Sequence, residues 1–195
     1  MEKYRLAIFA SGTGSNAKKI MEYFAGSEKI IVSLLVCNKP DAAVIGIAKE
    51  KSIPVLLIEK ERFFKGDGYL PELENAGISF IVLAGFLWKI PVKLIHAYPE
   101  RIVNIHPALL PKYGGKGMYG ARVHEAVIAA KDGESGITVH YVDELYDHGS
   151  AIFQARCPVY ADDTADTLAQ RIHHLEHEHY AKVIEHTILK DNNPA

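Results

Sequence analysis

Hydrophobic residues in the first half of the chain occur in short continuous runs, a pattern typical of strands buried on both faces. Segments with apolar positions at helical spacing follow these runs. The predicted strands span residues 4–10, 30–37, 53–58 and 80–84, and the predicted helices span residues 17–24, 42–51 and 68–76. This alternation of strand and helix predicts an α/β protein with a doubly wound, mostly parallel sheet.

The second half of the chain has a different pattern. A strand over residues 101–106 leads into a long glycine-rich loop, 107–120. Further elements are predicted as a helix at 121–131, antiparallel strands at 136–142 and 151–159 around a polar loop, and a long helix at 164–189. Thr164 is the expected N-cap of this last helix, with Thr167 as a poor partner for a capping box. We expect one domain over residues 1–190 and a frayed tail at 191–195.

Composition and charge narrow the classes of protein that need to be considered. The 195 residues are 48% hydrophobic and 24% charged, as in an ordinary globular protein. The net charge of −2 argues against a nucleic-acid partner, although it allows a local basic pocket. No apolar stretch reaches the roughly 18 residues that span a bilayer, and the N-terminus lacks the pattern of a signal peptide. We therefore expect a cytoplasmic protein, with no membrane partner and with Cys37 and Cys157 reduced.

The turn after the first predicted strand is a candidate phosphate-binding loop. Its residues are Gly12, Thr13, Gly14, Ser15 and Asn16. Glycines let backbone N–H groups approach a phosphate, and the start of a helix attracts negative charge. A dinucleotide site also needs an acidic residue after the second strand, and the sequence there is Cys-Asn-Lys. A monophosphate ligand therefore fits better than a dinucleotide, and a plain tight turn remains an alternative.

Two polar residues end the strand at 101–106. Because side chains alternate along a strand, Asn104 and His106 lie on one face, about 7 Å apart. Open α/β sheets bind their ligands at this end of their strands. The alternative is a hydrogen-bonded core histidine beside an asparagine. Asp147, in the polar loop after residue 142, is either a third member of this site or part of a solvated acidic turn.

Two other polar clusters have weaker signals. On the last helix, His173 and His177 lie four residues apart on one face and could bind zinc. The segment lacks the His-Glu-x-x-His order and has no cysteine nearby, so a solvated helix face is favoured and no metal is expected. Lys112 and Lys116 make the loop at 107–120 basic. This loop is either solvated or in contact with a phosphate or a glutamate tail.

The segment Asn-Ile-His-Pro-Ala-Leu-Leu-Pro at residues 104–111 resembles the signature of the folate-dependent formyltransferases. An Asp-x-Gly element follows at the expected distance, at residues 147–149. The resemblance extends over nearly the whole chain and includes residues 11–16, Ala-Gly-Phe at 84–86 and Glu-His at 176–177. The loop at 11–16 is similar to that of family members that act on glycinamide ribonucleotide. The resemblance implies a Rossmann-like formyltransferase fold.

The activity that this resemblance implies belongs to purine biosynthesis. The amine of glycinamide ribonucleotide would attack the formyl carbon of 10-formyltetrahydrofolate, its co-substrate, and form a tetrahedral intermediate. Asn104 and protonated His106 would stabilise the oxyanion, and His106, with a water, would carry the proton between the two nitrogens. Asp147 would pair with His106 and raise its pKa. No metal or covalent nucleophile is implied.

The resemblance also implies where both small-molecule substrates bind. The loop at 12–16 would hold the ribonucleotide phosphate, and Glu176 its glycinamide or ribose part. The folate site would comprise Leu87, Trp88, Lys89, Ile90, Asn104, Tyr141 and Val142. The chain departs from the family pattern at Ala108, in the glycine-rich loop at 113–120, and at Trp88-Lys89, where an Arg is common. A monomer and a homodimer are both compatible with the sequence.

Other interpretations stay open. Formyltransferases acting on methionyl-tRNA or nucleotide sugars are expected to carry a further domain, whereas this chain ends after its last predicted helix. A formyltetrahydrofolate hydrolase is expected to carry an N-terminal regulatory domain, whereas the first strand here begins at residue 4. In a nucleotide-binding module without catalysis, the grouping of Asn104, His106 and Asp147 would be coincidental.

Overall fold

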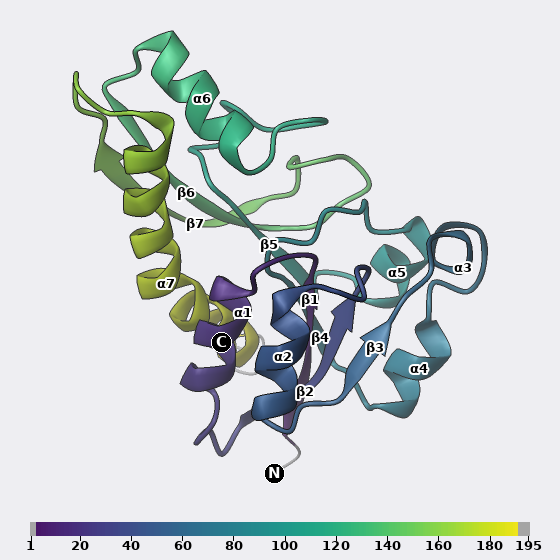
Figure 1. The fold of residues 1–195 in the computed structure, drawn as a ribbon. Coiled ribbons are helices and arrows are strands. Elements are labelled where there is room, and N and C mark those ends of the chain that lie inside the picture. The colour runs from purple at the N-terminus through teal and green to yellow at the C-terminus, as the bar shows by residue number, and fades with distance from the viewer. Residues whose placement is uncertain (1–2, 191–195) are drawn as a thin grey trace.

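The computed structural model describes residues 3–190, so the predicted tail at 191–195 lies outside the described residues. Within this range, seven strands form one sheet in the order β3-β2-β1-β4-β5-β6-β7 (Figure 1). The strands are β1 (Tyr4–Ala10), β2 (Ile30–Cys37), β3 (Val55–Leu57), β4 (Phe80–Leu83), β5 (Ile102–His106), β6 (Glu134–Tyr141) and β7 (Ala151–Pro158). Strands β1 to β5 are parallel, and β6 and β7 pair antiparallel. The predicted fold class is confirmed.

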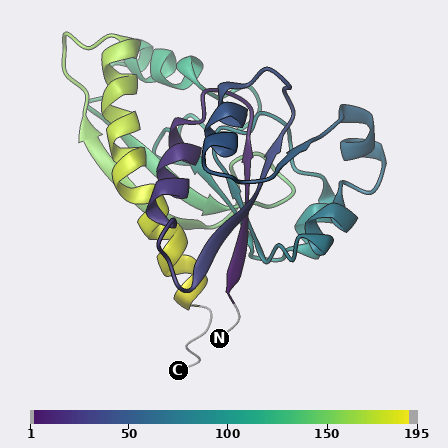
Figure 2. The same ribbon diagram turned by 60° about the horizontal axis from the view of Figure 1, so that its bottom comes forward.

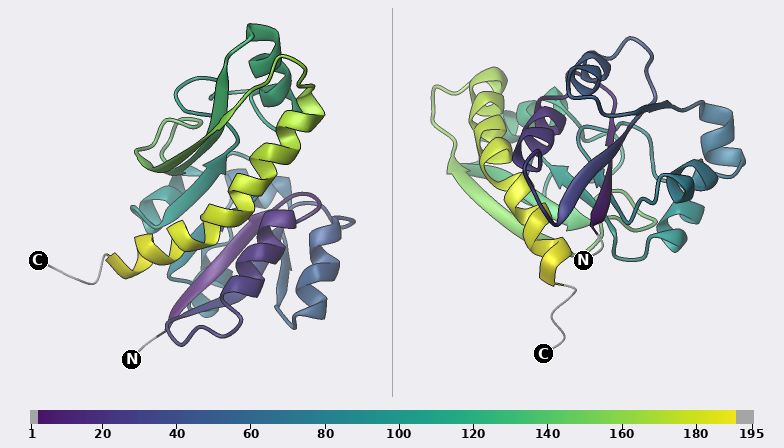
Figure 3. Two further views of the ribbon diagram at one scale, coloured as in Figure 1. Left: turned by 90° about the vertical axis from the view of Figure 1, so that its left-hand side faces the viewer. Right: turned by 90° about the horizontal axis from the view of Figure 1, so that it is seen from below.

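Helices cover both faces of the sheet (Figure 2, Figure 3). They are α1 (Ser15–Tyr23), α2 (Ala43–Glu50), α3 (Lys60–Lys65), α4 (Leu70–Asn75), α5 (Val92–Ala97), α6 (Ala121–Ala130) and α7 (Ala165–Lys190). Buried residues of α1, α2, α6 and α7 form one core cluster, and those of α3, α4 and α5 form the other. None of these helices is long and apolar enough to cross a membrane.

Strand β1 shows why continuous apolar runs predicted the centre of the sheet. Leu6 and Ile8 pack into the cluster under α1 and α7, whereas Ala7 and Phe9 pack into the cluster under α3 to α5. All four are essentially inaccessible to solvent. A strand segment with helices on both sides needs apolar residues at every position, and residues 6–10 supply them.

Two helices and one cap differ from the sequence-based expectations. Helices α3 and α5 were not predicted, because each has six residues and buries a single side chain, Phe63 or Leu94, so no apolar spacing repeats.

The expectation that Thr167 is a poor capping partner is wrong. The Thr167 N–H donates to Thr164 Oγ1 (3.2 Å), and the Thr164 N–H donates to Thr167 Oγ1 (2.9 Å), which is a reciprocal capping box.

Candidate active site

A cavity of about 720 Å³ opens at the carboxyl ends of β1, β4 and β5. This is where parallel α/β sheets bind ligands, and the volume suits a small-molecule substrate. The cavity wall includes every sequence-predicted site residue except Tyr141. Tyr141 was predicted to contact folate, but its side chain packs against the core cluster of α1 and α7, on the sheet face opposite to that of Val142. Alternation along β6 explains this correction.

The candidate phosphate loop is a sharp turn between β1 and α1. Gly14 precedes the helix with φ of +77°, and an added Cβ would lie 2.5 Å from Val44 Cγ2. Only glycine fits there. Any other residue would be strained by the positive φ, and its side chain would collide with Val44. Helix α1 begins at Ser15, and no side chain in the described structure caps this end. Its first backbone N–H groups are therefore available to an anion.

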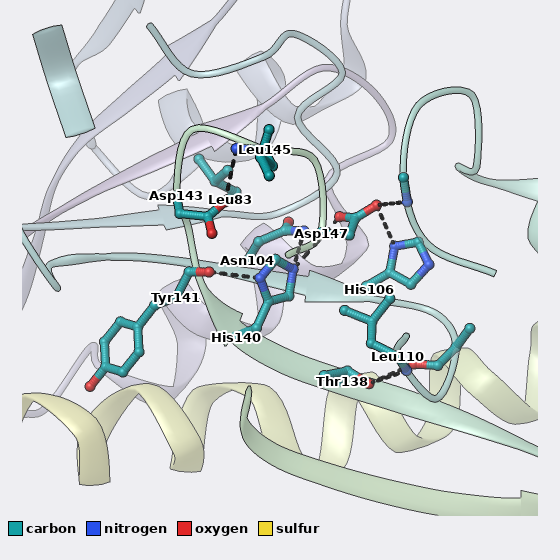
Figure 4. A network of polar contacts seen from close by, with 12 residues as sticks. Leu83, Asn104, His106, Leu110, Thr138, His140, Tyr141, Asp143, Leu145 and Asp147 are labelled. Atoms are coloured by element: carbon teal, nitrogen blue, oxygen red, sulfur yellow. Dashed lines mark hydrogen bonds and ion pairs between the residues drawn. The ribbon is translucent and has the colours of Figure 1, made fainter. Parts of the chain in front are cut away.

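Asn104 and His106 lie at the end of β5, beside a loop that brings Asp147 to the same place (Figure 4). The His106 side chain is 4% exposed, and its Nδ1 lies 3.5 Å from Asp147 Oδ2. The Gly115 N–H donates to the same Asp147 oxygen at 2.9 Å. The structure thus brings together the three residues predicted for catalysis, from two separate segments of the chain.

The protonation of His106 differs from the expectation. Burial lowers its pKa below the ordinary value, although Asp147 and the Tyr113 carbonyl act in the opposite direction. The prediction of a raised pKa for His106 is therefore wrong for the net shift. The prediction that Asp147 acts to raise this pKa is right. Burial alone would raise the pKa of Asp147, but His140, His106 and the Gly115 N–H hold it below its ordinary value.

His140 was not predicted from the sequence. It lies opposite Asn104 in the antiparallel pairing of β5 and β6. Its Nδ1 donates to the Tyr141 carbonyl at 2.8 Å, which leaves Nε2 of the neutral ring as an acceptor. This Nε2 lies 3.1 Å from Asn104 Nδ2 and 3.7 Å from Asp147 Oδ1 (Figure 4). His140 therefore orients the Asn104 amide, and its detection required the register of the two strands.

Glu176 links the last helix to the phosphate loop. It is 5% exposed, and its Oε2 accepts hydrogen bonds from Asn16 Nδ2 and His173 Nδ1, both at 2.9 Å. The hydrogen bond to Glu176 raises the pKa of His173.

His124 of α6 also lines the cavity and was missed, because a lone histidine on a helix carries no motif. Within residues 3–190, no three His, Cys, Asp or Glu side chains are placed to hold a metal ion.

A largely apolar segment forms another part of the cavity wall. It is formed after β4 by Leu87, Trp88, Lys89 and Ile90. The Trp88 ring lies 5.7 Å from Phe63 and 5.6 Å from Phe64, measured between ring centroids. Trp88 therefore packs against α3 and also lines the cavity.

Together these features define a class of protein. A phosphate-type helix start, a buried His–Asp pair and a largely apolar segment share one cavity of an α/β fold, which is an arrangement suited to an enzyme with a small-molecule substrate. The chain belongs to the formyl transferase family, which it matches over residues 4–184.

Named relatives agree with this assignment. A phosphoribosylglycinamide formyltransferase of Bacillus subtilis is 36% identical, over 96% of this chain and 96% of its own length. A chloroplastic phosphoribosylglycinamide formyltransferase of Arabidopsis thaliana is 45% identical over 92% of this chain, which spans only 64% of that relative's length. The crystal structure of the phosphoribosylglycinamide formyltransferase of Anaplasma phagocytophilum superposes with a TM-score of 0.87, at 30% identity, over 97% of this chain and 89% of that one.

Proposed function

We propose that this protein transfers the formyl group of 10-formyltetrahydrofolate to the amine of glycinamide ribonucleotide, a step of purine biosynthesis. The observation that carries the proposal is the buried His106–Asp147 pair, which shares one cavity with an uncapped helix start and a largely apolar wall. The helix start suits a phosphate, and the apolar wall suits a pterin ring. The names of the relatives from Bacillus subtilis and Arabidopsis thaliana support the acceptor and the transfer of a formyl group.

The reaction begins with attack of the acceptor amine on the formyl carbon. Because burial lowers the pKa of His106, its imidazole is available in the neutral form to take the proton that the amine loses. Nδ1 is the receiving atom, because Nε2 already donates to the Tyr113 carbonyl at 2.7 Å. Asp147, 3.5 Å from Nδ1, then stabilises the imidazolium.

Collapse of the tetrahedral intermediate completes the transfer. One Asn104 N–H donates to His140, and the second is free to donate to the oxyanion, which the imidazolium also stabilises. His106 returns its proton to N10 as the bond between that nitrogen and the formyl carbon breaks. The products are formylglycinamide ribonucleotide and tetrahydrofolate, and every proton is accounted for without a metal.

The substrates are assigned to the cavity wall as follows. Backbone N–H groups at residues 12–16 bind the ribonucleotide phosphate, and Glu176 contacts its ribose or glycinamide part. The pterin lies against residues 87–90, Asn104 and Val142. Because the chain has Trp88-Lys89 where an Arg is common in the family, Lys89 is the basic group of residues 87–90. Its Nζ lies 5.7 Å from the centre of the Tyr146 ring. We further propose a cytoplasmic location, although the Arabidopsis relative is named as chloroplastic.

A formyl-transfer assay with the purified chain tests the proposal. Formylated tetrahydrofolate is supplied with glycinamide ribonucleotide, with an unrelated amine, or with water alone. We expect tetrahydrofolate to form only with the ribonucleotide. Release with water alone would identify a hydrolase, transfer to the other amine would identify a different acceptor, and no release in any arm would indicate a binding module.

A further inference from the structure

One short turn holds both members of the His106–Asp147 pair. The Tyr113 carbonyl accepts a hydrogen bond from His106 Nε2 at 2.7 Å, and the Gly115 N–H donates to Asp147 Oδ2 at 2.9 Å. The turn is tightly placed, because a Cβ added at Gly114 would lie 2.5 Å from Leu110 Cδ2. The orientation of the imidazole therefore depends on where this turn is held.

The turn is anchored outside the cavity. The Tyr113 hydroxyl donates to Asp132 Oδ2 at 2.9 Å, and Lys112 Nζ donates to the same oxygen at 3.1 Å. Asp132 lies between α6 and β6 and forms no part of the substrate cavity wall. The Tyr113 hydrogen bond, followed by that from Lys112, lowers the pKa of Asp132, so its carboxylate is charged and a strong acceptor.

The two groups that face His106 favour different tautomers. A carbonyl only accepts, so the Tyr113 oxygen requires a proton on Nε2 and leaves the lone pair on Nδ1. The Asp147 carboxylate favours a proton on Nδ1, which would remove that lone pair. The balance between them depends on the carbonyl staying within hydrogen-bond distance of Nε2.

We propose that Asp132 is a positioning residue that acts through Tyr113 to fix His106 as the Nε2–H tautomer, with Nδ1 as the nitrogen that carries the proton. The effect on turnover rests on the proposed formyl transfer, whereas the tautomer can be observed without any substrate. Neither Asp132 nor the Tyr113 hydroxyl touches the reacting atoms. Their contribution is to keep the lone pair of His106 on Nδ1, the nitrogen beside Asp147.

The test uses two variants that break the anchor from opposite sides. Tyr113→Phe removes only the hydroxyl, and Asp132→Ala removes the acceptor. Asp132→Asn is the conservative variant, because its amide oxygen still accepts from Tyr113. Tyr23→Phe is the matched control, since it removes an equivalent tyrosine–carboxylate bond, 2.7 Å long, from Tyr23 to Glu185 away from the cavity.

Nitrogen-15 NMR of the His106 ring, at a pH where it is neutral, reports which nitrogen carries the proton. We expect Nε2–H in the wild type, in Tyr23→Phe and mainly in Asp132→Asn, with Nδ1–H appearing in Tyr113→Phe and Asp132→Ala. In the formyl-transfer assay, the latter two variants should lose roughly tenfold in kcat with KM nearly unchanged, because part of the proton transfer by a correctly placed His106 is lost. An unchanged tautomer in whichever of these two variants folds overturns the inference, even if the chain transfers no formyl group.

Discussion

The cavity is built in two different ways on its two sides. The phosphate-type loop is a single turn of five residues, and its groups are backbone N–H groups whose positions follow from Gly14 and the start of α1. The acid–base site combines side chains from β5 and from the loop after β6, and backbone groups of the turn at 113–115 hold these side chains in place. A backbone site can be built by local sequence, whereas a side-chain site requires the register of a whole sheet. Substitutions in the first region should therefore change binding, and those in the second should change turnover.

The largest expected effect is in the side-chain region. His106→Ala should lower kcat about 10²-fold or more, because it removes the proton carrier. Binding of each ligand alone should change by less than about threefold, since His106 contributes to the reaction rather than to the phosphate or pterin sites. Turnover assays and calorimetry on the same preparation check this. His186→Ala, an exposed histidine of α7, is the control, and near-normal turnover in His106→Ala would remove His106 from the mechanism.

Asp147→Asn should have the next largest effect, and it also reports on protonation. Loss of the carboxylate lowers the pKa of His106 further, because Asp147 acts against the lowering by burial. We expect at least a roughly tenfold lower kcat, since the imidazolium loses its counter-charge. NMR titration of His106 in both proteins measures the shift, and equal pKa values would show that Asp147 does not stabilise the imidazolium.

The same shift has a consequence for stability. A folded pKa below the ordinary value of 6.5 means that the unfolded chain binds more protons, so the His106 contribution to stability falls as pH drops from about 6.5. Once the pH is below the pKa of His106 in the folded protein, this contribution to stability falls no further. In Asp147→Asn the folded pKa is lower, so the loss due to His106 should extend to more acidic pH in denaturation experiments.

Gly12→Ala tests the backbone region. Gly12 lines the cavity, and an added Cβ there meets no protein atom within 4 Å, so the fold should be unaffected. The methyl group would block a close phosphate, and we expect acceptor binding to weaken about tenfold with folate binding unchanged. Gly26→Ala, also with open space around its Cβ, is the control. Equal weakening of both ligands would indicate that the loop does not bind phosphate selectively.

Gly14→Val separates binding from folding in the same loop. Its positive φ and the short distance to Val44 predict a loss of about 2 kcal/mol or more in the free energy of unfolding. Urea denaturation of both glycine variants measures the difference. If Gly14→Val were as stable as Gly12→Ala, the backbone of the loop would have to be less constrained than it is here.

The smallest expected effect concerns the apolar wall. Trp88→Leu should weaken binding of a folate analogue by up to about tenfold, the value of 0.5–1.5 kcal/mol for an aromatic contact. Ribonucleotide binding should not change. Phe64→Leu is the control, because Phe64 contacts Trp88 without lining the cavity. Calorimetry measures both, and unchanged folate affinity in Trp88→Leu would place the ring outside the folate site.

The same contrast explains what the sequence could predict. Continuous apolar runs identified the parallel strands, because residues 6–10 of β1 are all buried, and alternation placed Asn104 and His106 on one face. The placement of His140 beside Asn104 depends on the pairing of β5 with β6, which no local pattern encodes. The lowered pKa of His106 depends on burial by segments distant in sequence.

The central claim is that two substrates occupy opposite sides of one cavity and meet at His106. NMR of the isotope-labelled chain, titrated with each ligand separately, tests it most directly. The account predicts that glycinamide ribonucleotide shifts the backbone signals of residues 12–16, that a stable folate analogue shifts those of residues 87–90 and Val142, and that both shift His106. The account would be contradicted if both ligands shifted the NMR signals of the same side of the cavity. It would also be contradicted if neither ligand shifted the signals of His106.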